Sequence, residues 1–403
     1  HDMAMFSFVL WLTVNYAYEN YIGHTIYASL CLYLFLGLGA FWLLVKGRFG
    51  ILNNYHFVTM VLLLFVMFVS FFYIPESIVS SASRWTYRFF TNVILVFIVS
   101  NLVLDEKDMH FALKAVVAGG LLLSILFYAL YGENVLDVAE MADDPSSRLG
   151  WEFGNVNLLA QKCTFSVVIA FYYFLYSEKK MTRLLYFATA AVIFSVCLFS
   201  GSKKSILVVA FAIVYLVINK KEGKSALDRL KTVLTVVAII AAILLIIIAV
   251  PYFNIIEQRF MTLFDMIGGG RVSVSDMRRI TYIRRGLSQF LKSPFWGNGM
   301  NYSEFMFGTY SHNNYVEMLL NFGIIGFCIH YYSHFISARK ALTDKTDRKT
   351  NLLFMSVITA ILVTDIGVVT YYDRNIAIIM GLMSKYYSDL LPDKLKRMEE
   401  GEE

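Results

Sequence analysis

Long apolar segments alternate with short polar ones along most of the chain. A membrane-spanning helix needs about 20 mostly apolar residues, and by that measure the sequence predicts about twelve spans. The predicted spans lie near residues 4–20, 25–45, 57–75, 86–104, 110–131, 155–177, 183–200, 204–219, 230–251, 313–338, 351–371 and 375–391. The expected fold class is therefore all-α, a polytopic integral membrane protein that forms a single domain over residues 1–403.

The composition strengthens this prediction. Of the residues, 58% are hydrophobic and only 16% are charged, whereas soluble domains average about 25% charged residues. The 34 Phe and 26 Tyr exceed what one soluble core can hide. All four cysteines fall inside apolar segments, so the sequence predicts neither a disulfide framework nor a zinc site.

The basic residues set the expected orientation. Lys and Arg gather after the second, sixth, eighth and tenth predicted spans and in the C-terminal tail, which is typical of cytoplasmic segments. An even number of spans then places both termini in the cytoplasm. The polar, arginine-bearing loop at residues 252–311, inserted between the ninth and tenth spans, is consequently external and is expected to form a partly helical lid.

This loop contains a predicted amphipathic helix that is capped by Ser275 or Asp276 and runs to about Leu291. An arginine on either border of its apolar face, Arg279 or Arg284, could turn inward, and a guanidinium suits paired phosphate oxygens. The alternative is a basic helix attracted to lipid headgroups. The apolar face of this helix carries Ile280, Ile283, Leu287, Phe290 and Leu291. The opposite, polar face carries Arg278, Tyr282, Arg285 and Gln289. After Pro294, the glycines of Gly297–Gly299 are expected to let the backbone approach a ligand.

The tenth span begins with the run SHNNYVEMLLNFGIIG, residues Ser311–Gly326. His312 and Asn313 stand where this helix enters the membrane from outside, and Glu317 lies about one turn below. His312 or Asn313 could simply cap the helix. A neutral imidazole, which a helix N-terminus favours, could also take a proton from a hydroxyl.

Two further polar runs are predicted on the same side. The hairpin SGSKK places Lys203 and Lys204 at a helix N-terminus, where backbone N–H groups favour an anion, although ordinary headgroup contacts are the alternative. The run Ser147–Gln161 places Arg148 and several amides at the start of the sixth span, where they suit sugar hydroxyls. Two ionisable residues inside spans, Lys162 and Asp365, suggest a cavity open to the outside.

The chain resembles the O-antigen ligase / Wzy-type polymerase family of bacterial membrane glycosyltransferases. The resemblance rests on four motifs in order: R-x-x-G…G-N-x-N-x-x-A at Arg148–Ala160, S-G-S-basic at Ser200–Lys203, Arg279 fifteen residues before Pro294 with G-x-G at Gly297–Gly299, and H-N…G-x-x-G at His312–Gly326.

The resemblance implies an inverting, metal-independent transfer of a glycan from undecaprenyl diphosphate to a sugar hydroxyl, without a cofactor, at the external face of the bacterial plasma membrane. By analogy, Lys203 and Arg279 hold the diphosphate and His312 activates the acceptor, although the family usually has Arg where this chain has Lys203. The other candidate ligands of the diphosphate or glycan are Lys204, Arg148, Arg278, Arg284, Arg285, Asn313 and Glu317. The implied partners are the polyprenyl-diphosphate-linked oligosaccharide, membrane lipids, a flippase and a chain-length regulator.

The sequence favours a polymerase of capsule or O-antigen repeat units, because no device for a lipid-A-type acceptor is evident. A ligase that transfers the glycan to another acceptor is the alternative. A twelve-span flippase or transporter is the rival from another class, but it predicts polar residues at mid-membrane in both halves. A non-enzymatic scaffold would leave the loop arginines unexplained.

Overall fold

In the computed structural model, residues 1–50, 54–132, 149–220, 227–228, 231, 234 and 274–400 are described. Within these residues every regular element is helical, which confirms the all-α prediction. In chain order the elements are α1 (Asp2–Tyr18), α2 (Thr25–Lys46), α3 (Tyr55–Ser70), η1 (Glu76–Ile78), α4 (Val79–Leu102), α5 (Glu106–Tyr131), η4 (Trp151–Phe153), α6 (Val156–Tyr176), α7 (Lys180–Phe199), α8 (Lys203–Asn219), α11 (Val274–Phe290), α12 (Tyr302–Phe307), α13 (Asn314–Thr343), α14 (Arg348–Asp365), α15 (Arg374–Lys385), the π-helical η6 (Tyr386–Leu390) and α16 (Leu391–Glu399).

Among the described helices, six are long and apolar enough to cross a membrane: Thr25–Lys46, Glu76–Leu102, Glu106–Tyr131, Val156–Tyr176, Lys180–Phe199 and Asn314–Thr343. Two shorter apolar helices, Tyr55–Ser70 and Lys204–Asn219, accompany them. The chain is thus a membrane protein with helical spans, but the predicted count of about twelve is not confirmed. The predicted ninth span, residues 230–251, lies almost entirely outside the described residues.

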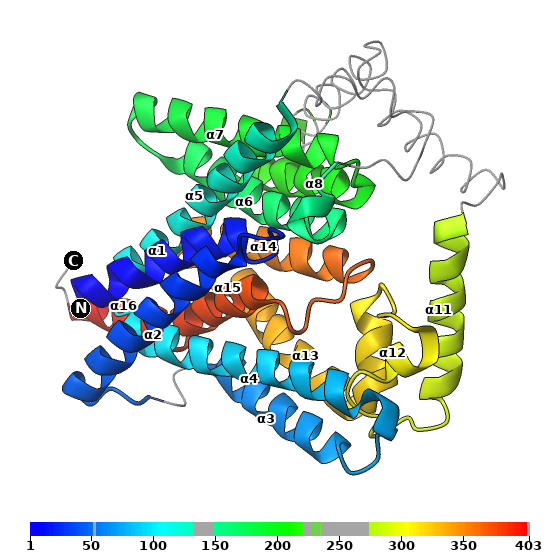
Figure 1. The fold of residues 1–403 in the computed structure, drawn as a ribbon. Coiled ribbons are helices and arrows are strands. Elements are labelled where there is room, and N and C mark those ends of the chain that lie inside the picture. The colour runs from blue at the N-terminus through cyan, green and yellow to red at the C-terminus, as the bar shows by residue number, and fades with distance from the viewer. Residues whose placement is uncertain are drawn as a thin grey trace.

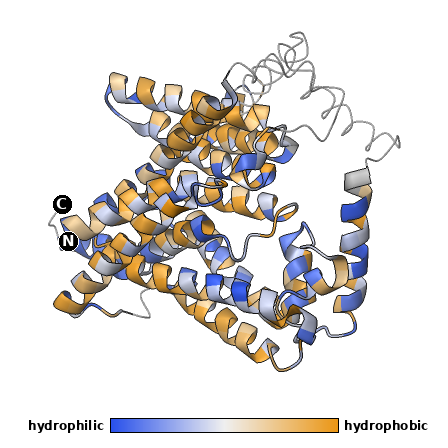
Figure 2. Cartoon of the chain, in the orientation of Figure 1, coloured by the Kyte–Doolittle hydropathy of each residue, from blue (hydrophilic) through white to orange (hydrophobic). Residues whose placement is uncertain are grey.

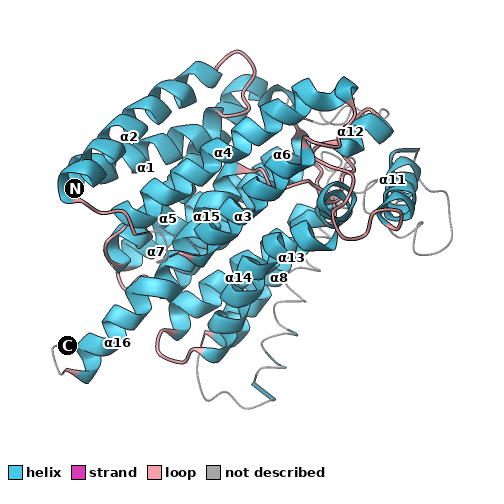
Figure 3. Ribbon diagram, turned by 90° about the horizontal axis from the view of Figure 1, so that it is seen from below, coloured by secondary structure: helices cyan, strands magenta, loops and turns pink. Residues whose placement is uncertain are grey.

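The helices form one elongated bundle with chemically different ends. Both termini lie at one end of the bundle, and α11 and α12 lie at the opposite end in both ribbon views (Figure 1, Figure 3). Most bundle helices are hydrophobic, whereas hydrophilic residues are prominent on α11 and α12 (Figure 2). Below, the end that carries α11 and α12 is called the polar end.

The core lies where the helices cross. Helix α1 packs against α2 and α5, α6 packs against α7, and α13 packs against α3 and α14. Large side chains such as Trp11, Tyr16 and Phe354 are completely buried at these contacts. By contrast, only 28% of the apolar stretch of α2, and the same share of α7, is buried. Their exposed apolar faces are those that lipid would cover.

Short polar side chains fix where the helices at the polar end begin. Asn155 caps α6, Asn313 caps α13 and Asp373 caps α15, each accepting backbone N–H bonds through its side-chain oxygen. Such caps satisfy N–H groups that the helix itself leaves without partners.

Helix α13 is interrupted, although the hydrophobic pattern predicts an unbroken span over 313–338. Gly323 has φ 63° and ψ −165°, a conformation outside the helical region. The interruption lets the carbonyl oxygens of Leu320 and Asn321 accept the backbone N–H groups of Asn298 and Gly299, at 2.9 and 2.7 Å. The tenth span therefore binds the preceding loop through its own backbone.

Helix α14 ends at Asp365, about six residues earlier than its predicted span, which reached residue 371. The Asp365 carboxylate accepts hydrogen bonds from the Tyr331 hydroxyl at 2.7 Å and the Asn314 amide at 3.1 Å, and the Thr370 hydroxyl also donates to it. These bonds bring the following loop, residues 366–373, back against the start of α13.

The two ionisable residues expected to line one cavity are instead paired within the protein. Asp365 is completely buried in the bonds just described. The Lys162 amine donates to the Tyr16 carbonyl at 3.0 Å and lies 3.4 Å from the Glu19 carboxylate. Because a charge buried away from water needs a partner, each has a structural explanation that requires no cavity.

Candidate functional site

His312 occupies a strained turn directly before α13. Its φ of 59° lies in the left-handed region, which is uncommon for residues other than glycine. The imidazole lies 4.1 Å from the Tyr310 ring and 6.3 Å from the Tyr282 ring, centroid to centroid. Its Nδ1 atom is buried without a hydrogen-bond partner among the described residues, so the edge that carries Nε2 is the accessible one. Strained residues held in place by their surroundings are frequent at functional sites.

Three cationic side chains act on this imidazole. Burial lowers the pKa of His312, and the positive charges of Arg279, Lys204 and Arg278 lower it further, to about 4. A neutral imidazole is therefore held beside three positive charges from two separate helices, α8 and α11. We call His312 and these three cations the cationic site.

Helix α11 confirms the predicted amphipathic helix, but its packing differs from what the pattern alone suggests. Part of the predicted polar face packs against protein: Tyr282 stacks on Phe307 with ring centroids 4.5 Å apart, and Gln289 donates to Asn298 at 2.9 Å. Gly286 lies so close to α13 that a Cβ there would be 2.6 Å from Val316. The apolar side chains Ile280, Leu287 and Leu291 are exposed instead.

This orientation distinguishes the two arginines that border the apolar face. Arg279 is partly buried and acts on His312, whereas Arg284 is exposed. Arg278 is exposed too, although its charge reaches His312. Exposed Arg285 lies over the Phe307 ring, 5.9 Å from its centroid. Among the four predicted arginines of this helix, Arg279 is thus the one that the structure both brings to the imidazole and partly buries.

The sixth-span motif reaches the site through one hydrogen bond. The Asn155 amide donates to the Tyr310 hydroxyl at 2.9 Å, and Asn155 also caps α6. Burial raises the pKa of Tyr310, which keeps this hydroxyl protonated at neutral pH. Sequence reasoning overlooked Tyr310, and its position two residues before His312 was the available signal. Arg148 lies outside the described residues.

The predicted hairpin between the seventh and eighth spans is confirmed as a tight turn over residues 200–202, with Gly201 at φ 62°. The Lys204 side chain lies against Gly367 in the loop between α14 and α15. A Cβ at Gly367 would fall 1.4 Å from the lysine nitrogen, so this position tolerates no side chain in this arrangement. The Lys203 backbone begins α8, and the Lys203 side chain lies outside the described part of the protein.

Two of the predicted ligands hold the loop before α13 in place. Asn313 caps α13, and its amide donates to the Ile366 carbonyl at 3.2 Å. Glu317 is 1% exposed. Its carboxylate accepts the Ser311 backbone N–H at 2.8 Å and the Asn321 amide at 3.2 Å, together with the Ser303 hydroxyl. The polar atoms of both side chains are therefore bonded to other groups of the protein, and these bonds fix the backbone next to His312.

The G-x-G turn approaches protein backbone, where the sequence suggested a ligand. A Cβ on Gly297 would lie 2.5 Å from the backbone of Asn321 and Gly323, and a Cβ on Gly323 would lie 2.3 Å from the Phe295 carbonyl oxygen. Four backbone bonds join the segments: Asn298 to Leu320, Gly299 to Asn321, Ile324 to Pro294 and Ile325 to Phe295. This backbone contact between two glycines fixes the loop that follows α11.

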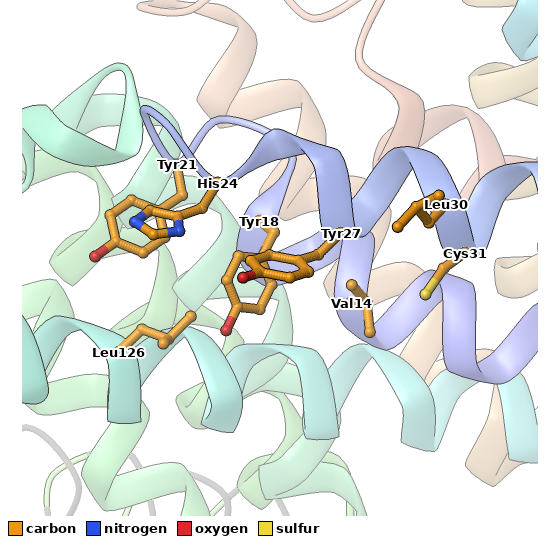
Figure 4. A pocket seen from close by; sticks show the side chains of 8 residues that line it. All are labelled: Val14, Tyr18, Tyr21, His24, Tyr27, Leu30, Cys31 and Leu126. Atoms are coloured by element: carbon orange, nitrogen blue, oxygen red, sulfur yellow. The ribbon is translucent and has the colours of Figure 1, made fainter.

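A separate cavity of about 510 Å³ lies between the α1–α2 hairpin and α5 (Figure 4). Tyr18, Tyr21, His24 and Tyr27 line one part of it, and the remaining lining residues are Val14, Leu30, Cys31 and Leu126. It contains none of the residues of the cationic site.

In the described part of the chain, no three His, Cys, Asp or Glu side chains gather in an arrangement that could hold a metal ion.

Comparison with known proteins agrees with these motifs. No curated protein matches the chain. A family model described as O-antigen ligase matches residues 188–331, a stretch that includes Lys204, Arg279 and His312. Over residues 188–331, this match supports the resemblance to the O-antigen ligase/Wzy family found in the sequence.

Proposed function

We propose that the protein is a membrane polymerase that joins polyprenyl-diphosphate-linked oligosaccharide repeat units. The observation that carries this proposal is the neutral imidazole of His312 beside Arg279, Lys204 and Arg278. The cations suit a departing diphosphate, and the imidazole suits the proton of an attacking hydroxyl. An enzyme that transfers a glycan from a lipid diphosphate to a hydroxyl needs positive charge for the leaving group and a base for the hydroxyl.

In the proposed reaction, the Nε2 atom of His312 takes the proton of an acceptor hydroxyl as its oxygen attacks the anomeric carbon of the donor sugar. The bond between that carbon and the phosphate oxygen breaks, and the diphosphate leaves with the electron pair. Attack from the face opposite the leaving group inverts the anomeric centre. The positive charges of Arg279 and Lys204 stabilise the charge that develops on the diphosphate, and the side chains thus supply both requirements without a cofactor.

The other predicted site residues have supporting roles in this proposal. Arg278 contributes to the charge around the diphosphate, and Lys203 and Arg148 are proposed as further ligands of the phosphate or glycan. Arg284 and Arg285, which are exposed on α11, are proposed to meet the donor only as it approaches. Asn313 and Glu317, whose polar atoms are bound within the protein, are proposed as positioning residues for His312.

We further propose a topology of about twelve spans in a bacterial plasma membrane, with both termini cytoplasmic and the cationic site external. The position of the termini at the end opposite α11 and α12 supports it (Figure 1). The exposed apolar side chains Ile280 and Leu287 of α11, and Leu291 directly after it, would face the outer headgroup layer, with the helix as a lid. A flippase that delivers the donor and a chain-length regulator are proposed partners.

The test is transfer by purified protein in nanodiscs that are given a polyprenyl-diphosphate oligosaccharide. A ladder of products identifies a polymerase, and one discrete product on a second acceptor identifies a ligase, the activity after which the matching family model is named. Movement of the donor across the bilayer without a change in bonding identifies a flippase.

The residue roles are tested in the same assay. His312→Ala and Arg279→Ala should each reduce transfer about 10²-fold or more, as loss of a transition-state partner does. Lys292→Ala is the matched control, because this exposed cation lies just after the same helix and has no proposed role in transfer. Full activity of both site variants would refute the assignment.

A further inference from the structure

A second group of side chains, outside the cationic site, faces the polar end. Trp85, near the start of α4, and Tyr372, in the loop between α14 and α15, have ring centroids 4.3 Å apart at 33°. Both rings are partly exposed. A tilted aromatic pair in close contact that remains partly exposed offers a ligand a rigid apolar surface with little loss of side-chain freedom.

An arginine is locked at the edge of this pair. The guanidinium carbon of Arg88 lies 5.6 Å from the centroid of the Trp85 ring, and its Nη2 atom lies 2.9 Å from the Glu19 carboxylate. Glu19 is itself held by Lys162 at 3.4 Å and Arg374 at 4.0 Å. The Nε atom of Arg88 is buried, but the side chain keeps 31% of its surface exposed, so the Nη N–H groups that do not bind Glu19 can donate to a ligand in a fixed direction.

One loop connects the aromatic pair to the cationic site. At Gly367 the loop lies against Lys204, and five residues later it carries Tyr372. Between these points Asn314 accepts the backbone N–H groups of Thr370 and Tyr371, at 2.9 and 3.2 Å. Asn314 follows His312 by two residues, and its side chain holds the backbone directly before Tyr372. The positions of the imidazole and the Tyr372 ring therefore both depend on Asn314. An extended chain spans at most about 3.6 Å per residue, which keeps the Cα atom of Tyr372 within about 18 Å of the Cα atom of Gly367, the residue that lies against Lys204.

The two groups come from different structural elements. The cations come from α8 and α11, whereas the aromatic pair and Arg88 come from α4 and the far end of the loop before α15. An attack that inverts the anomeric carbon requires the acceptor to approach opposite the leaving group. If the cations hold the diphosphate, the aromatic pair and Arg88 are left as candidates to hold the acceptor.

A sugar ring matches this surface chemically. Its C–H groups form an apolar face that packs on aromatic rings, and its hydroxyls form a polar rim that accepts bonds from donors such as a guanidinium. We propose that Trp85, Tyr372 and Arg88 bind a sugar ring of the acceptor glycan and present its hydroxyl to His312. This proposal rests on the proposed function, which supplies the glycan, and it adds where the acceptor binds.

The test measures binding separately from transfer. The free oligosaccharide repeat unit, released from its lipid diphosphate, is titrated into purified protein by isothermal calorimetry. Trp85→Ala and Tyr372→Ala should weaken binding about tenfold or more, the equivalent of about 1.4 kcal/mol. Trp85→Phe and Tyr372→Phe, which keep a ring, should retain most of the affinity. Trp296→Ala is the control, because this tryptophan is 54% exposed and stacks on no described ring.

The transfer assay completes the experiment. Trp85→Ala should raise the KM for an added acceptor glycan with little change in kcat, and Trp85→Phe should restore it. Unchanged affinity in both alanine variants, or no binding of the free glycan by the intact protein, would overturn the proposal. Glycan binding that is lost in Trp85→Ala but kept in His312→Ala supports it. The proposed function fails on a different result, full transfer by His312→Ala and Arg279→Ala.

Discussion

Replacement of Gly297 by alanine tests whether backbone contact between the loop and α13 builds the site. Gly297 has φ 69°, and a Cβ there would lie 2.5 Å from the backbone carbon and oxygen of Asn321 and from the Gly323 nitrogen. All three are backbone atoms of a packed helix, so no side-chain rotation relieves the contact. The loop must therefore lift away from α13.

The expected cost has two parts. A left-handed conformation costs a residue with a Cβ about 1–2 kcal/mol. Lifting the loop also breaks the backbone bonds that join residues 294–299 to α13, which are Asn298 to Leu320, Gly299 to Asn321, Ile324 to Pro294 and Ile325 to Phe295. At about 1 kcal/mol for each bond, the loss approaches about 4 kcal/mol, or nearly 10³-fold in the equilibrium for opening.

Gly308→Ala is the matched control, because Gly308 has φ 68° but no described atom beyond its own neighbours lies within 4 Å of the position that a Cβ would take. It carries the conformational cost without the backbone contact. Hydrogen exchange by mass spectrometry follows the amides of Asn298, Gly299, Ile324 and Ile325. Gly297→Ala should lower their protection by up to about 10³-fold, and Gly308→Ala should leave it near that of the unchanged protein.

Transfer should follow the same order, because the lifted loop is the one that follows the helix carrying Arg279. Equal protection and equal transfer in the two alanine variants would show that the contact between Gly297 and α13 contributes nothing to the site.

Three further outcomes follow from the charges and contacts of the polar end. Burial and three cations hold the pKa of His312 at about 4, so kcat/KM should stay level from neutral pH down to near 4 and fall below it. Arg279→Gln removes a charge that lowers this pKa and should move the acid limb of the profile to higher pH. An unmoved limb would exclude His312 as the base. Burial raises the pKa of Glu19, but Lys162, Arg88 and Arg374 outweigh it and lower the value from 4.5 to about 2, so its stabilisation is complete above 4.5 and is lost as the pH falls through about 2. Glu19→Gln should cost about 3–5 kcal/mol at pH 7 in thermal or denaturant unfolding, whereas an unchanged midpoint would show that the pairing contributes nothing. Gly367→Ala should displace the Lys204 amine and reduce transfer as much as Lys204→Ala does, with no further loss in the double variant; additive losses would show that Gly367 acts on another group.

The hydrophobic pattern led correctly to a helical membrane protein, and the family motifs led to a resemblance that the match over residues 188–331 supports. They also located the amphipathic helix that became α11 and the turn at Gly201, because both depend on short-range sequence. The choice of Arg279 and His312 could be made from the motifs, and the structure brings the charge of Arg279 to the imidazole. Whether either residue acts in transfer stays a prediction.

The face on which α11 packs could not be inferred from its own amphipathic pattern. Tyr282 and Gln289 of the polar face pack against protein because Gly286 lets α13 approach and Tyr282 stacks on Phe307, and neither partner is a neighbour in sequence. Likewise, the pairing of Lys162 with Glu19 depends on how α1 and α6 are brought together, so a charge inside a predicted span does not by itself indicate a cavity.

By itself, the sequence determined the class of fold, the positions of most helices and the residues with suitable chemistry, because helix formation and membrane insertion depend on local composition and spacing. Only the tertiary structure decided which polar residues gather around His312 and which are bound within the protein. Glu317 and Arg279 look equally available in the sequence, yet the Glu317 carboxylate is occupied by Ser311, Ser303 and Asn321 while Arg279 faces His312. That difference arises because a buried polar group must find its partners among segments distant in the chain, and local sequence does not specify which segments those are.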